Sequence, residues 1–181
     1  FMARVVAATE AECDQEHIRM LVDHNPTVPN RHDAIAGNTP SVGPCLAAMA
    51  AGLEFSGADF LVMVCNTAHA YGEDICAAVK IPFISIIDET VRGLDNYGAT
   101  GVGIMAAEGC LQAELYQDAL TENGYQPVTW SEREVIEFMD LVYRIKAGDR
   151  SAELQTGMSK LAASLVLGGA EVLIAGCTEI P

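Results

Sequence analysis

One stretch of this sequence occurs twice, and that duplication constrains the fold more than any other feature. Residues 57–69 read GADFLVMVCNTAH, and residues 169–181 read GAEVLIAGCTEIP. Each copy has Gly-Ala-acid, an apolar run, a cysteine eight positions after the glycine, and a threonine just beyond that cysteine. The apolar runs do not alternate with polar residues, which is typical of strands buried on both faces of a parallel sheet. The sequence therefore predicts two similar units, whose buried strands end at Cys65 and Cys177.

Apolar runs of strand length alternate with helix-forming segments along the whole chain. Strands are predicted at residues 18–25, 59–65, 81–87, 101–107, 125–130 and 171–177, and helices at 1–12, 44–57, 68–80, 88–98, 112–124, 132–147 and 151–168. This alternation indicates an α/β fold with parallel sheets flanked by helices. We expect two similar domains, residues 1–82 and 83–181, with a hinge near residues 80–88. We also expect a further strand before the first helix and a further helix after the last strand, outside these 181 residues.

The charge balance argues against a nucleic-acid partner. The chain has 10 basic and 25 acidic residues, a formal net charge of −15, and its basic residues do not cluster. No apolar run reaches the roughly 18 residues of a membrane span, and the first residues lack the basic flank of a signal peptide. The six cysteines show no zinc-type spacing and no sign of a small disulfide-stapled domain. We expect a cytoplasmic protein with free thiols and no metal site, which binds a small molecule and neither nucleic acid nor membrane.

Cys65 and Cys177 each lie at the carboxyl end of a predicted strand, where ligands bind in open parallel sheets. The residues after them, 66–67 and 178–179, suit the start of a helix or turn. Backbone N–H groups at such a start attract anions and lower the pKa of a thiol. Both cysteines are therefore candidates for chemistry.

Most cysteines behave as small, inert, buried hydrophobic residues, and we interpret Cys13, Cys45 and Cys76 in that way. Two equivalent cysteines in two similar halves can instead face each other across one cleft. A thiolate can then remove a proton from one face of a carbon while a thiol returns a proton to the other face, which inverts the configuration. Hydrogen-bond donors at the substrate carboxylate would stabilise the carbanion that develops.

These features resemble the aspartate/glutamate racemase family, and most closely its cofactor-independent aspartate racemases. The matching segments are DQEH at 14–17, NPTVPNR at 25–31, GADFLVMVCNTAH at 57–69, IPFISIIDET at 81–90, YRIKAG at 143–148 and AGCTEIP at 175–181. They cover nearly the whole chain in the family's order. The resemblance implies two α/β domains related by a pseudo-twofold axis, an active site in the cleft between them, no cofactor, and a homodimer.

The resemblance also implies eight site residues of three kinds: two catalytic cysteines, four neighbours that hold the α-carboxylate and amino group, and two basic residues near the site. In that order they are Cys65 and Cys177; Asn66, Thr67, Thr178 and Glu179; and Arg31 and Lys146. From the residues alone, Arg31 suits bidentate carboxylate binding, although an arginine is more often a solvated surface residue. Lys146 also suits the end of a helix, and we expect His69 to pack against its own strand rather than to catalyse.

The sequence departs from the family at two places near the site. Ala106, Ala107 and Glu108 replace a threonine-rich turn that contacts the substrate carboxylate in aspartate racemases, and NRH at 30–32 stands where the family often has DRT. The predicted function is racemisation of an acidic amino acid, aspartate or glutamate, by a two-base thiol mechanism. Two alternatives stay open. One is a two-cysteine decarboxylase or cis–trans isomerase of a related dicarboxylic acid, and the other is an inactive relative that only binds ligand.

Overall fold

A computed structural model describes residues 1–180 of the chain. Its α-helices are α1 (Met2–Ala8), α2 (Arg31–Ile35), α3 (Gly43–Phe55), α4 (Gly72–Ala78), α5 (Ile86–Gly93), α6 (Glu108–Gln112), α7 (Leu115–Glu122), α8 (Glu132–Lys146) and α9 (Ala152–Leu167). Short 3₁₀ helices are η1 (Asp14–Glu16), η2 (Thr67–Tyr71) and η3 (Leu94–Asn96). The strands are β1 (Leu61–Val62), β2 (Phe83–Ile84), β3 (Gly101–Ala106), β4 (Gln126–Val128) and β5 (Val172–Gly176). Pro181, the last residue of the second copy of the repeat, lies outside the described residues.

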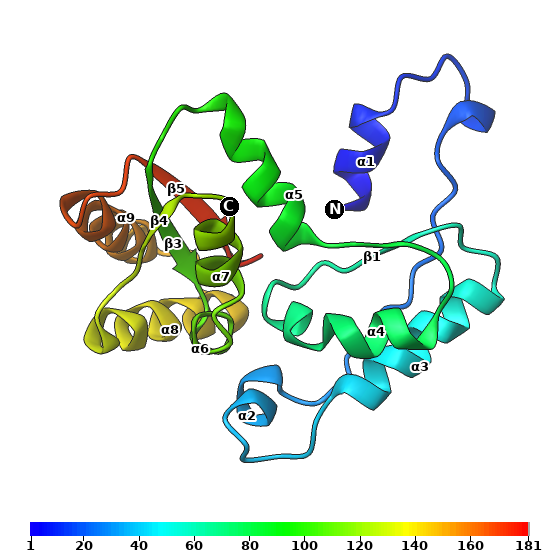
Figure 1. Cartoon of the computed structure of the whole chain (residues 1–181), viewed down its shortest axis with the longest axis horizontal. Coiled ribbons are helices and arrows are strands. Elements are labelled where there is room, and N and C mark those ends of the chain that lie inside the picture. The colour runs from blue at the N-terminus through cyan, green and yellow to red at the C-terminus, as the bar shows by residue number, and fades with distance from the viewer. Residues whose placement is uncertain (181) are drawn as a thin grey trace.

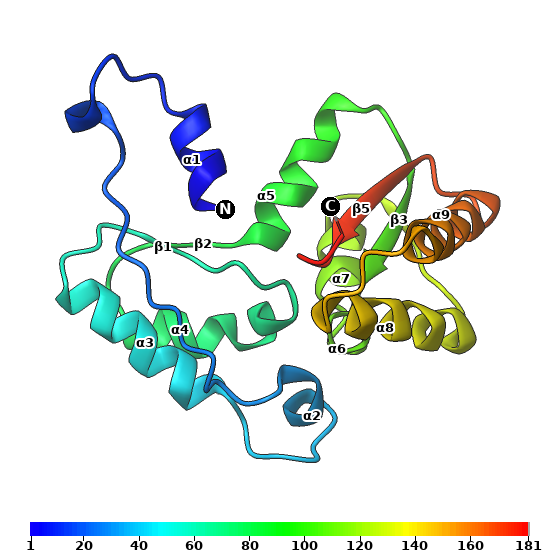
Figure 2. The same ribbon diagram turned by 180° about the vertical axis from the view of Figure 1, so that it is seen from behind.

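Two parallel sheets form the framework, as the alternation of strands and helices predicts. One sheet pairs β1 with β2, and the other has the order β4-β3-β5. We call residues 1–85 the N-terminal half and residues 86–180 the C-terminal half; Figures 1 and 2 show the halves side by side, with α5 leading from one to the other. Because β2 pairs with β1, the first sheet extends beyond residue 82, and the division into domains at that position stays a prediction.

The sheet of the C-terminal half is covered by helices on both faces. All six residues of β3 are buried, which accounts for an apolar run without polar alternation. Val102 and Ile104 pack toward α5 and α7, whereas Met105 packs toward α8 and α9. The carboxyl ends of β3 and β5 therefore emerge from a buried core that is packed on both faces.

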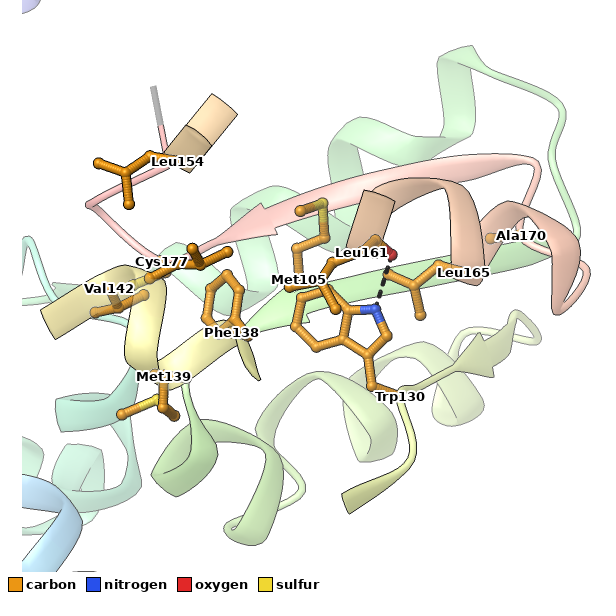
Figure 3. Packing of buried hydrophobic residues seen from close by; sticks show 12 residues of the cluster. Met105, Trp130, Phe138, Met139, Val142, Leu154, Leu161, Leu165, Ala170 and Cys177 are labelled. Atoms are coloured by element: carbon orange, nitrogen blue, oxygen red, sulfur yellow. Dashed lines mark hydrogen bonds between the residues drawn. The ribbon is translucent and has the colours of Figure 1, made fainter. Parts of the chain in front are cut away.

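The cluster between this sheet and helices α8 and α9 reaches the end of β5. Trp130 packs against Phe138 with ring centroids 4.8 Å apart, and its indole N–H donates a hydrogen bond of 2.9 Å to the carbonyl of Leu161. Figure 3 shows Cys177 in the same cluster, beside Phe138. The packing of α8 and α9 thus holds the second cysteine of the repeat in an apolar surrounding.

The N-terminal half departs from the sequence prediction at three strands. The strand predicted at 81–87 is reduced to β2 at Phe83–Ile84, because Ser85 caps α5 and the helix begins at Ile86. Residues 18–25 form no strand, and the predicted strand at 59–65 is reduced to β1 at Leu61–Val62. Residues 21–25 and 61–65 both line an apolar groove of about 780 Å³. Across that groove no backbone hydrogen bond joins the two segments within residues 1–180, so neither can extend the sheet. Residues with a high strand propensity do not form a strand here, because a strand also needs a hydrogen-bonded neighbouring strand.

Among residues 1–180, no helix is both long enough and apolar enough to span a bilayer.

The close approach of β3 to the second copy of the repeat gives a stability prediction. A Cβ atom on Gly101 would overlap the backbone carbonyl of Gly169, which cannot move without disturbing the sheet. We expect Gly101→Ala to lower the free energy of unfolding by about 2–3 kcal/mol. Gly52→Ala is the matched control, because Gly52 lies exposed in α3 and its Cβ would meet no atom within 4 Å. That control should gain up to about 1 kcal/mol, since alanine favours the helix. Equal urea midpoints for the two variants would contradict the close contact.

Candidate active site

A polar cavity of about 120 Å³ is lined by residues from both halves. Its lining includes all eight residues that the sequence singled out: Arg31, Cys65, Asn66, Thr67, Lys146, Cys177, Thr178 and Glu179. The other lining residues are His32, Val64, Ala107 and Gly176. The chain thus brings four separate segments, each containing part of the predicted site, around one small space. The roles of these residues in binding and catalysis stay predictions.

The apolar groove of the N-terminal half is larger but is a weaker candidate for chemistry. It shares Arg31, Val64 and Cys65 with the small cavity, and most of its other lining residues are apolar. Binding sites for small molecules combine shape with a few converging polar groups. Those groups converge in the cavity of about 120 Å³, and we place the candidate site there.

On the N-terminal side, His69 ties Cys65 to the next helix. The N–H of Ile86 donates to Nε2 of His69 (3.1 Å), so a neutral ring carries its proton on Nδ1 and donates it to the carbonyl of Cys65 (2.8 Å). The ring also packs against Phe83, with centroids 5.3 Å apart. Burial lowers the pKa of His69, which favours this neutral form. The sequence predicts that His69 packs against its own strand, but the ring packs against Phe83 of the neighbouring strand β2, and only the bond to Cys65 is made to its own segment.

Asn66 is held by a residue that the sequence analysis missed. Asn66 directly precedes η2, as expected for the start of a helix or turn, but its side chain makes no hydrogen bond that caps η2. Instead, the hydroxyl of Tyr116 donates a buried hydrogen bond of 2.6 Å to Oδ1 of Asn66. Tyr116 lies on α7 in the C-terminal half, and no sequence motif links it to a residue 50 positions away.

On the C-terminal side, Cys177 is a protonated thiol paired with a carboxylate. Its side chain is 8% exposed, and its Sγ–H donates to Oε2 of Glu179 at 3.0 Å. Burial, followed by the hydrogen bond to Glu179, raises the pKa of Cys177 to about 12. The expectation that a helix start lowers the pKa of this thiol is therefore wrong. A turn, not a helix, follows β5 within the described residues, and burial outweighs the backbone dipoles.

Glu179 connects Cys177 to a lysine. Nζ of Lys146, at the end of α8, lies 3.7 Å from Oε1 of Glu179, and the hydroxyl of Thr178 donates to Oε2 at 3.2 Å. Burial opposes ionisation of Glu179, but the bond from Cys177 and the charge of Lys146 outweigh it, and the pKa of Glu179 is lowered. The ionised carboxylate therefore accepts the hydrogen bond of the Cys177 thiol and favours its protonated form.

The loop before α2 brings a histidine to the cavity beside Arg31. Asn30 caps α2 by accepting the N–H of His32, and Arg31 donates to the carbonyl of Pro29 at 3.2 Å. Nδ1 of His32 accepts the N–H of Gly109 (3.1 Å), which joins α2 to α6 of the other half. Burial, with the charges of Lys146 and Arg31, lowers the pKa of His32. NRH at 30–32 is one of the two departures from the family. Its histidine, His32, provides the hydrogen bond to Gly109 of the other half.

The altered turn at residues 106–108 brings no acid into the cavity. Ala107 lines the cavity, whereas Glu108 is exposed and is not among the lining residues. Cys110, two residues further, is buried, and burial together with nearby Cys65 and Cys177 raises its pKa to about 12. Cys110 is therefore a third, protonated thiol close to the predicted pair. Within residues 1–180, no group of three or more His, Cys, Asp or Glu side chains is arranged to hold a metal ion.

Comparison with known families and sequences identifies relatives of this chain. The sequence model of the family described as Asp/Glu/Hydantoin racemase matches residues 1–181. The broad specificity amino-acid racemase RacX of Bacillus subtilis (strain 168) is 29% identical over 128 residues, which is 71% of this chain. The aligned part covers 55% of the length of that relative.

Comparison with solved structures supports the fold. The aspartate racemase of Picrophilus torridus superposes with a TM-score of 0.80 at 23% identity, covering 99% of this chain and 75% of its own. An aspartate racemase homologue from Pyrococcus horikoshii OT3 gives a TM-score of 0.67 at 24% identity, covering 82% of this chain and 67% of its own. At this level of identity the structures show a shared fold.

Protonation of His69 should weaken the structure around Cys65. The pKa of His69 is lowered below its ordinary value of 6.5, so its contribution to stability is complete above pH 6.5 and is lost as the pH falls through the folded-state pKa. We expect His69→Gln to be less stable than wild type near pH 7.5. The variant should also lose less of its unfolding free energy between about pH 7.5 and pH 5.5.

Urea unfolding at each pH measures this effect. His24→Gln is the matched control, because His24 is exposed. If wild type and His69→Gln lost the same free energy over this pH range, the proposed titration of His69 would be wrong.

Replacement of Glu179 should make the Cys177 thiol easier to ionise. Glu179→Gln removes a negative charge beside Sγ, so we expect the pKa of Cys177 to fall from about 12, although burial will keep it above its ordinary 9.0. The measurement is the pH dependence of iodoacetamide alkylation at Cys177, followed by peptide mass spectrometry. Glu171→Gln is the control, because Glu171 binds the N–H groups of Thr100 and Gly101 just before β5. An unshifted alkylation profile in Glu179→Gln would rule out this electrostatic role.

Proposed function

Because this chain belongs to the Asp/Glu/hydantoin racemase family, we propose that it interconverts the two enantiomers of an acidic amino acid without a cofactor. The observation that carries the proposal is that Cys65 and Cys177 line one cavity. Each cysteine follows a strand of a different parallel sheet, one in each half of the chain. Two thiols that approach one small cavity from separate halves suit the removal and return of a proton at opposite faces of a carbon.

The proposed reaction moves one proton off the α-carbon and another onto it. The thiolate of one cysteine takes the α-proton, the C–H electron pair stays on the carbon, and the thiol of the other cysteine protonates the opposite face. At rest Cys177 is the thiol, since its pKa is raised to about 12. Cys65 then acts as the base for one enantiomer, and the roles are reversed for the other. For the other enantiomer the reaction runs in reverse, from the state left by the forward turnover, in which Cys177 is the thiolate and Cys65 the thiol. The positive charge of Lys146 lowers the pKa of Cys177 and so favours that thiolate.

The rest of the cavity supplies groups suited to an acidic substrate. Arg31 and Lys146 place positive charge at the lining, and arginine suits carboxylate binding. Thr67 and Asn66 follow Cys65 directly and offer polar side chains at the same cavity. Donors to the α-carboxylate would stabilise the negative charge that spreads onto it as the proton leaves. We assign these residues to substrate binding as part of the proposal.

Aspartate and glutamate are the first substrates to test. The relative from Bacillus subtilis is described as a broad specificity amino-acid racemase, which motivates a wider panel. A decarboxylase or cis–trans isomerase of a related dicarboxylic acid was suggested by the altered turn, but Glu108 of that turn is exposed. The homodimeric state and the cytoplasmic location that the family resemblance and the composition suggest remain part of this proposal.

Loss of either cysteine should abolish racemisation while the fold survives. With single enantiomers of aspartate and glutamate in D₂O, we expect Cys65→Ala and Cys177→Ala each to lower racemisation by about 10²–10⁴-fold. Each variant should still exchange the α-proton of one enantiomer for deuterium, detected by NMR. Cys13→Ala is the control, because Cys13 is exposed and is not a lining residue of the cavity.

Three outcomes would change this assignment. Full racemisation by either single variant would contradict the two-base mechanism. Turnover of maleate or an arylmalonate, with no exchange in any amino acid, would favour the isomerase or decarboxylase. Ligand binding without any turnover would identify an inactive relative.

A further inference from the structure

We propose that Tyr116 is a positioning residue for the candidate site. Its hydroxyl holds Oδ1 of Asn66, so that the amide NH₂ group is the part of Asn66 presented to the substrate carboxylate. This inference rests on the proposed function, because it takes Asn66 to bind the substrate. Tyr116 itself is not among the residues that line the cavity.

The contact between the two side chains is short and shielded from water. The hydroxyl oxygen of Tyr116 lies 2.6 Å from Oδ1 of Asn66, and the two residues are 1% and 6% exposed. Burial raises the pKa of Tyr116 to about 12, so the phenol keeps its proton and remains a donor at neutral pH. A buried amide oxygen that lost this donor would be left unsatisfied, which is costly.

The orientation of the Asn66 amide follows from this contact. An asparagine side chain has one acceptor oxygen and one NH₂ donor group on the same carbon. Because the oxygen is engaged by Tyr116, the NH₂ group is left to serve the cavity, which Asn66 lines immediately after Cys65. A free amide could turn by half a rotation and present its oxygen, which would repel a carboxylate.

The donor and the acceptor belong to different halves of the chain. Tyr116 is on α7, packed beneath β3 and β5 with Leu120 and Ile174, and Asn66 lies in the loop after β1. The bond therefore forms only when the two halves are docked as they are here. The orientation of a group beside Cys65 thus depends on the core of the opposite half.

A double-mutant cycle tests the proposal: wild type, Tyr116→Phe, Asn66→Ala and the double variant, each with kcat and KM for the acidic amino acid that wild type racemises fastest. Tyr116→Phe keeps the buried ring and removes only the hydroxyl. We expect it to lower kcat/KM by about 10- to 100-fold, mostly through kcat, because the α-carboxylate gains charge in the transition state. In the Asn66→Ala background the same change should alter kcat/KM less than about 2-fold.

Tyr125→Phe is the matched control, because its hydroxyl donates to Asp95 at the surface (3.0 Å), remote from the cavity lining. We expect wild-type kinetics for it. Urea unfolding of every variant allows rates to be expressed per folded molecule, so a loss of folded protein is not taken for a loss of turnover.

The outcomes separate this inference from the function on which it rests. A wild type without racemase activity would overturn the proposed function and, with it, the role of Tyr116. An active wild type in which Tyr116→Phe is equally harmful with and without Asn66 would overturn only the positioning role, since a purely structural tyrosine acts independently of Asn66. A Tyr116→Phe variant with wild-type kcat/KM would also overturn only the positioning role.

Discussion

Three hydrogen bonds between the halves underlie the candidate site. Side chains of the N-terminal half accept all three: His32 from the N–H of Gly109, Asn66 from the hydroxyl of Tyr116, and His69 from the N–H of Ile86. Both histidines can accept only while their rings are neutral, and burial lowers the pKa of each. The same hydrogen bonds that join the two halves therefore also hold the residues around Cys65. The geometry of the site depends on how the halves are packed together.

The two cysteines of the repeat occupy unlike surroundings. Cys177 is packed beside Phe138 and paired with Glu179, whereas Cys65 is half-buried and follows a strand of only two residues. Duplication made the cysteines equivalent in sequence, but the cores behind them differ. A two-base reaction tolerates this difference, because it needs one thiol and one thiolate at the start of each turnover.

Prediction from sequence succeeded for elements whose own pattern of apolar residues indicates which side is buried. The strands at β3, β4 and β5 and the long helices α8 and α9 lie where the apolar pattern indicated. It failed at residues 18–25, because a strand forms only beside a hydrogen-bonding neighbour, and residues 61–65 lie across a groove from them. It also failed for the pKa of Cys177, because burial by α8 and α9 cannot be read from the residues after the cysteine.

The sequence by itself determined the parallel α/β framework, the repeat that ends in Cys65 and Cys177, and the family to which the chain belongs. These depend on local periodicity and on motifs, which a linear sequence contains. Only the tertiary structure decided that the eight candidate residues share one cavity, that His32 also lines it and contacts Gly109, and that Tyr116 contacts Asn66. Such contacts join residues 50 and 77 positions apart, and no local rule of the chain sets which buried donor meets which acceptor.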